Sequence, residues 1–427
     1  MTFGGNGQLQ SLGGRAMTPG TDQANVALDI CDLSVVYRTP AGDVRAVDGV
    51  NLALHSGEVV GLAGESGSGK STLAYGACRL LRAPALITNG SVHYQGRRSA
   101  EPVEILQLRR EQLRRLRWRE IAIVFQSAMN ALNPVLNVRD QMLDVIYAHL
   151  KISKRDAAEK VGSLLDLVGI PRTRLRSYPH ELSGGMRQRV MIAMALATDP
   201  EVVIMDEPTT ALDVVVQRDI LAQIVELKER LGFSILFITH DLSLLLELAD
   251  RIAVMYAGQL VEIGTAEQIH HEPSHPYTKG LLNSFPSLRG PRRELAGIPG
   301  SPPDLHRPPP GCRFLPRCPY GTQACARIDM RLSPVSTSAD RGHVTACPFV
   351  LPDTPVAPRS QVLGLTSTDE RGTTKVPSQE PPENPPSGYV PGDVAERVLV
   401  DGSPPDSLDG SHLAALDVEP SRGELGT

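Results

Sequence analysis

The octapeptide at residues 64–71, GESGSGKS, constrains the fold of this chain more than any other feature. It fits the pattern G-x-x-x-x-G-K-[ST], and it lies between an apolar run at residues 59–63 and a helical pattern from Lys70. Glycines let backbone amides converge on phosphate oxygens, and a helix N-terminus adds its positive end. We therefore expect Lys70 to reach the β- and γ-phosphates of a nucleoside triphosphate and Ser71 to ligate Mg²⁺. The predicted binding residues are Gly64, Glu65, Ser66, Gly67, Ser68, Gly69, Lys70, Ser71 and Thr72.

Beyond this loop, strand and helix patterns alternate. Apolar runs at residues 202–205 and 235–238 predict buried strands. Two helices follow from apolar residues at helical spacing, which are Val161, Leu164, Leu165 and Val168 in one and Val216, Ile220, Ile224 and Leu231 in the other. Gly169 and Gly232 are expected to end them. The alternation predicts an α/β fold with a parallel sheet, as in a P-loop NTPase, with ligands at the carboxyl ends of the strands. The strand and helix that flank residues 64–71 disfavour the alternative of a flexible Gly/Ser turn.

Polar residues follow two of the predicted strands. Asp206 and Glu207 end the first, and His240 comes after the second. Beside a phosphate loop, we expect Asp206 to hold Mg²⁺, usually through water, and Glu207 to activate the attacking water. His240 could hydrogen-bond the γ-phosphate. Taken alone, the two carboxylates would be an acidic loop and His240 a solvated loop histidine.

Composition narrows the class of protein further. The formal net charge of −5 argues against a general nucleic-acid binder. The longest apolar run, at residues 190–197, is too short to span a membrane, and the N-terminus lacks the apolar region of a secretory signal, so we expect a cytoplasmic protein with reduced cysteines. Residues 1–26 are Gly-rich, and residues 351–427 are acidic and Pro-rich, so both are expected to be disordered.

The sequence LSGGMRQR at residues 182–189, followed by the Asp206-Glu207 strand, resembles the nucleotide-binding subunit of an ATP-binding cassette (ABC) transporter. The resemblance runs from about residue 27 to 286. It implies that Tyr37 stacks on adenine, that Gln126 touches Mg²⁺ or the attacking water, and that Asp213, within Ala211-Leu212-Asp213, couples two sites. It also implies that Ser183, Gly184 and Gly185 contact an ATP held by the opposite subunit of a head-to-tail dimer. Glu207, His240 and Gln126 are then the catalytic residues.

Three short motifs resemble the oligopeptide/dipeptide importer subfamily, which includes nickel importers: residues 177–181 (SYPHE), 275–278 (HPYT) and 298–303 (IPGSPP). The resemblance implies an ATPase that powers peptide import from the cytoplasmic face of the inner membrane. Its partners would be two permease subunits, a second related ATPase and an extracytoplasmic binding protein. The expected organisation is an ATPase domain at residues 27–290, with a helical subdomain at about 127–200, and a Cys-rich extension at residues 291–350.

Four of the six cysteines cluster in that extension: Cys312, Cys318, Cys325 and Cys347. In a cytosolic protein, such clustering favours a metal over disulfides. The spacing matches neither common ferredoxin runs nor paired zinc knuckles, so iron–sulfur, zinc and free structural thiols remain open. The resemblance to peptide-importer ATPases favours a structural [4Fe-4S] cluster. Cys31 and Cys78 stand apart and are expected to be small buried hydrophobes.

Two other functions compete with transport. A soluble ABC ATPase that acts on nucleic acid or ribosomes could use the basic cluster formed by Arg109, Arg110, Arg114, Arg115, Arg117 and Arg119. However, the second cassette, coiled coil or large zinc insertion of such relatives is missing here, and a solvated helix face explains the arginines. A regulatory module that binds ATP without turnover is disfavoured by the intact Glu207 and His240.

Overall fold

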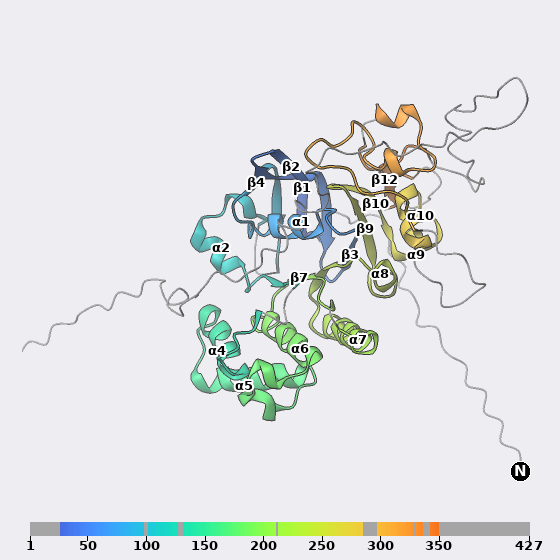
Figure 1. Cartoon of the computed structure of the whole chain (residues 1–427). Helices are drawn as coiled ribbons and strands as arrows, with labels where there is room; N and C mark the ends of the chain where they lie inside the picture. Colours follow the sequence, from blue (N-terminus) through green and yellow to red (C-terminus); the bar gives the residue numbers. More distant parts are fainter. Residues whose placement is uncertain are drawn as a thin grey trace, which may run out of the picture. The chain divides into compact units, whose positions relative to one another are not determined.

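The computed structural model describes residues 26–97, 101–126, 131–210, 212–284, 297–327, 330–335 and 342–349 (Figure 1). Contacts divide the chain into a unit over residues 1–365 and a unit over residues 366–427, and every described residue lies in the first. The predicted leader up to residue 25, Ala211 and the predicted tail from residue 351 lie outside the described residues. No helix in these ranges is both long enough and apolar enough to cross a bilayer.

The larger sheet has eight strands in the order β11-β12-β10-β9-β3-β8-β7-β6. Its strands are β3 (Val59–Ala63), β6 (Ile121–Val124), β7 (Val202–Asp206), β8 (Ser234–Ile238), β9 (Arg251–Tyr256), β10 (Gln259–Thr265), β11 (Ser333–Pro334) and β12 (Val344–Thr345). The five strands from β9 to β6 pair in parallel, which confirms the predicted parallel sheet for the centre of the fold. Every residue of β3, β6, β7 and β8 is buried, as expected for a parallel sheet covered on both faces.

A second, antiparallel sheet was not predicted from the sequence. Its order is β2-β1-β4-β5, with β1 (Val26–Thr39), β2 (Gly42–His55), β4 (Ala85–Tyr94) and β5 (Val103–Glu104). Along β1, Leu28 and Ile30 are buried, but beyond an irregularity the buried positions become Leu33 and Val35. This one-residue change of phase hides the period-two pattern of the strand. Apolar residues of this sheet and of α1 share one core cluster.

Nine α-helices are described: α1 (Lys70–Ala77), α2 (Arg110–Leu116), α4 (Val138–His149), α5 (Lys154–Leu167), α6 (Gly184–Ala195), α7 (Val214–Leu231), α8 (Leu242–Leu248), α9 (Ala266–His271) and α10 (Pro276–Asn283). Short 3₁₀ helices lie at Ile105–Gln107, Arg172–Arg176, Pro179–Glu181, Leu315–Arg317 and Gln323–Ala326. Helices α4, α5 and α6 contact one another and form a helical group next to α7 (Figure 1). They lie within the range expected for a helical subdomain.

Helices α5 and α7 confirm two predictions from apolar spacing. Helix α7 begins after its N-cap Asp213 and ends at Gly232, whose φ of 71° is the left-handed conformation that glycine tolerates. Leu231 does not belong to the buried face, because it is 43% exposed at the last turn. The helix leaves the core at that point, although Leu231 is its last residue, as the spacing predicts.

The C-terminal segment, described over residues 297–327, 330–335 and 342–349, folds against the main sheet in these ranges. Strand β12 pairs with β10 through Glu262 and Thr345. The fully buried carboxylate of Glu262 accepts hydrogen bonds from the backbone amides of Ser274 (2.6 Å) and His275 (2.9 Å) and bonds Nε2 of His343 (2.8 Å). A buried carboxylate with these partners fixes the segment in place.

Candidate functional site

The loop between β3 and α1 has a backbone that only glycine can supply. Gly64, Gly67 and Gly69 have φ values of 151°, 75° and 105°. A Cβ at Gly64 would lie 2.2 Å from the carbonyl oxygen of Met255, and one at Gly69 would lie 2.2 Å from that of Ala46. Any side chain at either position would force the backbone apart. The glycines of this loop therefore meet a backbone requirement at Gly64 and Gly69.

Lys70 lies inside this loop. Its Nζ donates to the carbonyl oxygens of Gly64 (2.8 Å) and Glu65 (2.9 Å). Burial lowers the pKa of Lys70 and outweighs the attraction of Glu207, Asp206 and Glu65. The buried hydroxyl of Ser68 has no hydrogen-bond partner among the described residues. A buried cation and an unpaired donor within one glycine cradle fit an anionic group.

Asp206 lies at the carboxyl end of β7 and is completely buried. Its Oδ1 accepts a hydrogen bond from Ser71 (3.0 Å) and its Oδ2 accepts one from Tyr75 (2.6 Å). Burial raises the pKa of Asp206 in spite of these bonds. Tyr75 was missed by the sequence analysis, although its position four residues after Ser71 places both on one face of α1.

Glu207 is the centre of a second network. Its Oε2 accepts hydrogen bonds from Nε2 of Gln126 (2.9 Å) and the hydroxyl of Thr210 (3.0 Å), and Nδ1 of His240 lies 3.2 Å from Oε1. Burial alone would raise the pKa of Glu207, but the bonds from His240 and Thr210 lower it. The φ of 45° at Glu207 is unusual for a non-glycine residue, and such strain is concentrated at functional sites. The fold thus brings together the three residues predicted to be catalytic.

The antiparallel sheet contributes to the same site through Tyr37. The hydroxyl of Tyr37, on β1, lies 3.2 Å from that of Thr72 on α1. The predicted adenine contact is therefore next to the phosphate loop.

Glu65 is held by the C-terminal segment, which the sequence did not predict. Its Oε2 and Oε1 accept hydrogen bonds from Nη1 (2.8 Å) and Nη2 (3.0 Å) of Arg317. Its backbone amide donates to the hydroxyl of Tyr277 (2.8 Å). The paired geometry is the strong two-bond contact that arginine makes with carboxylates. The sequence carries no signal for this pair, because Arg317 is 252 residues away.

The predicted signature residues lie elsewhere. Ser183 caps α6 through a 3.3 Å bond from the amide of Met186 to its hydroxyl, and Asp213 caps α7. Both are exposed, as are Val214 (69%) and Val215 (71%). Within the described part of the chain, no hydrogen bond or ion pair joins Ser183, Gly184, Gly185 or Asp213 to the phosphate loop. Gly184 and Gly185 are half-buried, whereas Ser183 and Asp213 are open to solvent.

All four clustered cysteines line one apolar pocket, together with His275 and Phe314. Burial, reinforced by neighbouring thiols, raises the pKa of Cys312 to about 11 and that of Cys318 to about 12. Nε2 of the buried His275 has no hydrogen-bond partner among the described residues. All six cysteines of the chain are free thiols. Cys78 is buried as expected, whereas the expectation for Cys31 is wrong, because it lies half-buried on the outer face of β1.

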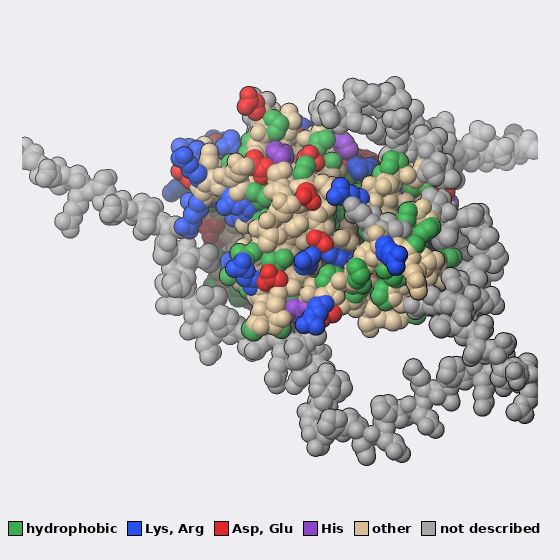
Figure 2. Space-filling view, turned by 90° about the horizontal axis from the view of Figure 1, so that it is seen from above, with side chains coloured by type: hydrophobic (Ala, Val, Ile, Leu, Met, Phe, Trp, Pro, Cys, Tyr) green, Lys and Arg blue, Asp and Glu red, His purple; other side chains and the backbone are tan. Residues whose placement is uncertain are grey.

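The basic cluster divides into surface and structural arginines. Basic side chains gather on the side of the molecule where α2 lies (Figure 2). Arg115 bonds Glu111 (2.5 Å), one turn earlier on α2, and both side chains are 76% exposed. By contrast, Arg117 donates to the carbonyl oxygens of Cys78 (2.9 Å) and Arg79 (2.5 Å). Arg117 therefore links α2 to the end of α1, while Arg115 belongs to a solvated helix face.

Two regions of the chain match known protein families. Residues 47–210 match the ABC transporter family, and residues 261–325 match the C-terminal region of oligopeptide/dipeptide transporters. Among solved structures, the cbiO1 component of the ABC transporter complex cbiONQ from Clostridium perfringens covers 58% of this chain and 92% of its own, with 27% identity and a TM-score of 0.50. Fold and site together define an ATPase of the ABC class.

Full-length relatives define the subfamily. The oligopeptide transport ATP-binding protein OppD of Salmonella typhimurium is 44% identical over 332 residues, which is 77% of this chain and 96% of the relative. The dipeptide transport ATP-binding protein DppD of Bacillus subtilis is 43% identical over 323 residues, 75% of this chain and 93% of the relative. The chain belongs to the oligopeptide/dipeptide transport ATP-binding proteins of the ABC family.

Proposed function

We propose that this protein hydrolyses ATP to drive the import of small peptides through a membrane permease. The observation that carries the proposal is the contact between Glu207, Gln126 and His240 beside a phosphate loop. The matched C-terminal region of peptide transporters supports the substrate class. The mainly structural role of Arg117 and the ion pair on α2 give no support to nucleic acid as the substrate.

The residues of the site fit ATP and Mg²⁺. Ser71 and Asp206, now hydrogen-bonded at 3.0 Å, would hold the ion together with Gln126, and a bound Mg²⁺ would neutralise phosphate charge. Lys70 would exchange its two carbonyl bonds for phosphate oxygens. Glu207 would orient the attacking water and accept its proton, while His240 holds the carboxylate in place and reaches toward the γ-phosphate.

A second chain would complete the site. The exposed Ser183 and the half-buried Gly184 and Gly185, at the N-terminus of α6, would offer a hydroxyl and backbone amides to the nucleotide of a partner. Asp213 and the apolar Val214 and Val215 lie on an exposed surface that a partner would cover. To shift such a dimer from mostly open to mostly closed, ATP must favour the closed state by roughly 5.5 kcal/mol, and hydrolysis removes that bias.

Membrane partners follow from the same proposal. The ATPase would act with two permease subunits, a second ABC ATPase and an extracytoplasmic peptide-binding protein, at the cytoplasmic face of the inner membrane. Copurification from the native membrane, followed by identification of the bound proteins, tests this assembly. Recovery of RNA or ribosomes without permeases, with ATPase activity stimulated by RNA, would favour the soluble alternative instead.

The substitution Glu207→Gln tests the catalytic assignment. It keeps the shape of the side chain but removes the base, so we expect ATP binding to persist while hydrolysis falls by about 10²- to 10⁴-fold. Closed dimers should accumulate with ATP in gel filtration. Glu229→Gln is the matched control, because Glu229 is an exposed carboxylate on α7 and its substitution should leave turnover unchanged. Normal turnover in Glu207→Gln would remove Glu207 from this role.

The cysteine pocket would hold a structural [4Fe-4S] cluster. Cys312, Cys318, Cys325 and Cys347 all line it, and thiolates are the ligands that such a cluster requires. A [4Fe-4S] cluster and a tetrahedral zinc ion can both take four thiolates. The resemblance to peptide-importer ATPases favours the cluster.

Anaerobic purification with iron and sulfide analysis tests the cluster. We expect both elements in the wild-type protein and in Cys78→Ala, and neither in Cys318→Ser, because Cys78 is buried away from the pocket. Colourless wild-type protein without iron and sulfide would end this proposal.

A further inference from the structure

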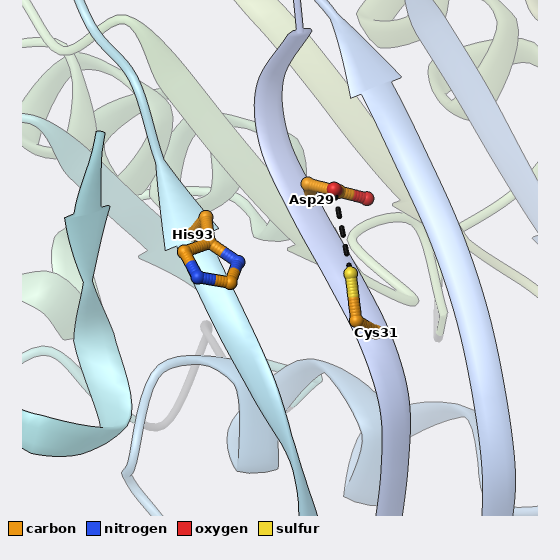
Figure 3. A group of neighbouring side chains, drawn as sticks. All are labelled: Asp29, Cys31 and His93. Atoms are coloured by element: carbon orange, nitrogen blue, oxygen red, sulfur yellow. Dashed lines mark hydrogen bonds between the residues drawn. The ribbon is translucent and has the colours of Figure 1, made fainter. Parts of the chain in front are cut away.

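Three potential metal ligands meet on the outer face of the antiparallel sheet. Asp29 and Cys31 project from β1 on the opposite side from the buried Leu28 and Ile30, and His93 projects from β4 (Figure 3). The antiparallel register sets Asp29 directly opposite His93. One ligand atom from each of the three residues lies within 4.8 Å of the other two. This group is separate from the phosphate loop and from the cysteine pocket.

The histidine is already oriented for a ligand. Nε2 of His93 lies 3.0 Å from Oε2 of Glu104, and Figure 3 shows the other ring nitrogen on the side of β1. Glu104 is itself fixed, because its Oε1 accepts hydrogen bonds from the amides of Val92 (3.0 Å) and Leu106 (3.1 Å). In zinc sites, a carboxylate commonly hydrogen-bonds one ring nitrogen of a histidine while the other nitrogen binds the metal.

The distances and donors fit a small borderline cation. The sulfur of Cys31 lies 3.4 Å from Oδ2 of Asp29, close to the edge of about 3.6 Å between a thiolate and a carboxylate oxygen on tetrahedral zinc. Thiolate, imidazole and carboxylate together suit zinc, whereas Mg²⁺ prefers oxygen alone. Burial, together with the hydrogen bond and charge of Asp29, raises the pKa of the Cys31 thiol, and a cation between them would reverse this effect.

We infer that Asp29, Cys31 and His93 bind one zinc-class divalent cation, which ties β1 to β4. The fourth position is open to water, since all three residues are only partly buried. Binding releases the thiol proton of Cys31 to solvent, so affinity rises with pH. The alternative is a hydrogen-bonded surface cluster that takes up no ion.

Zinc stoichiometry by equilibrium dialysis of the full chain is the first test. We expect Asp29→Asn, Cys31→Ser and His93→Gln each to bind one zinc fewer than the wild type. Asp32→Asn is the matched control, because it removes the same charge three residues along β1 and Asn tolerates the φ of 49° there. Any zinc bound by the C-terminal cysteines contributes equally to the wild type and to every variant, so it does not affect the difference in stoichiometry. Equal stoichiometry in the wild type and Cys31→Ser would overturn the inference.

Alkylation of the wild-type protein provides a test that needs no variant. At a zinc concentration ten times the dissociation constant, we expect Cys31 to be labelled about tenfold more slowly, as located by mass spectrometry. The same concentration of Mg²⁺ should give no protection, because a hard cation does not bind the thiolate. An unchanged rate of Cys31 labelling with zinc would show that the thiol is not a ligand.

Discussion

The ion pair between Arg317 and Glu65 predicts that the C-terminal segment controls the phosphate loop. The substitution Arg317→Met keeps most of the apolar stem and removes the guanidinium. Arg317 is 6% exposed, and its loss takes two bonds from Glu65. It also takes one bond each from the carbonyl oxygens of Pro299 (2.9 Å) and Ile298 (3.3 Å) and one from the hydroxyl of Tyr256 (3.3 Å). The loop residue Glu65 then loses the partner that fixes its side chain.

The magnitude follows from the burial of the two partners. Removing one member of a buried ion pair lowers the unfolding free energy by about 3–5 kcal/mol when the other charge stays buried away from water. Glu65 keeps 26% of its side chain exposed and can regain water, so we expect about 2–3 kcal/mol of lost unfolding free energy. The affinity for ATP should also fall, because Glu65 belongs to the loop that we propose binds the phosphates.

A double-mutant cycle with Glu65→Gln isolates the pair. Residues in direct contact couple by about 0.5–3 kcal/mol, and we expect the upper half of this range for two charge-assisted bonds. The measurements are urea unfolding and ATP binding for the wild type, both single variants and the double variant. Arg307→Met is the control, since Arg307 is an exposed arginine in the same segment.

Additive effects of Arg317→Met and Glu65→Gln, with no coupling energy, would refute the reasoning. So would an unchanged ATP affinity in both single variants, because the pair would then hold the segment without influencing the loop.

Two further predictions concern protonation. Tyr75→Phe removes the 2.6 Å hydrogen bond to the buried Asp206, and that bond opposes the rise in the pKa of Asp206. The pKa of Asp206 should therefore rise further, and the acid limb of ATPase activity should move to higher pH. An unmoved pH profile would contradict this. Burial lowers the pKa of His275 to about 4, so as the pH falls this histidine is protonated in the unfolded chain before it is protonated in the folded one. The wild type should therefore lose roughly 3 kcal/mol of unfolding free energy between about pH 6.5 and 4. His275→Asn keeps an acceptor for the amide of Tyr277 and should flatten this acid loss in urea unfolding, whereas an equal slope would rule out His275 as its source.

The central strands and the phosphate loop could be predicted because their signals are local. The run at β3 and the octapeptide that follows it carry strand, turn and helix signals within about twenty residues. Strand β7 could be predicted in the same way, and it places Asp206 at its carboxyl end. Strand β1 could not, because its change of phase between Ile30 and Leu33 breaks the alternation.

The partners of the site residues could not be predicted from the sequence. Gly64 and Lys70 are defined by spacing, but Glu65 meets Tyr277 across 212 residues and Arg317 across 252. Such pairs are set by how β10, α10 and the C-terminal segment pack, and no periodicity encodes that arrangement. The prediction that Cys31 is buried was wrong for a similar reason. Its burial depends on which face of the antiparallel sheet it occupies, and that sheet was not predicted.

The two family-matched regions meet at the loop between β3 and α1. Residues 47–210 contain Glu65, and residues 261–325 contain Tyr277 and Arg317, which bind its amide and its carboxylate. The rings of Tyr277 and Phe314 pack against Tyr256 of β9 at 4.5 Å and 5.2 Å between centroids, so the second region is anchored to the central sheet as well as to the loop. Because Glu65 has both partners in that region, residues 261–325, which match the C-terminal region of peptide transporters, support the structure of the loop between β3 and α1.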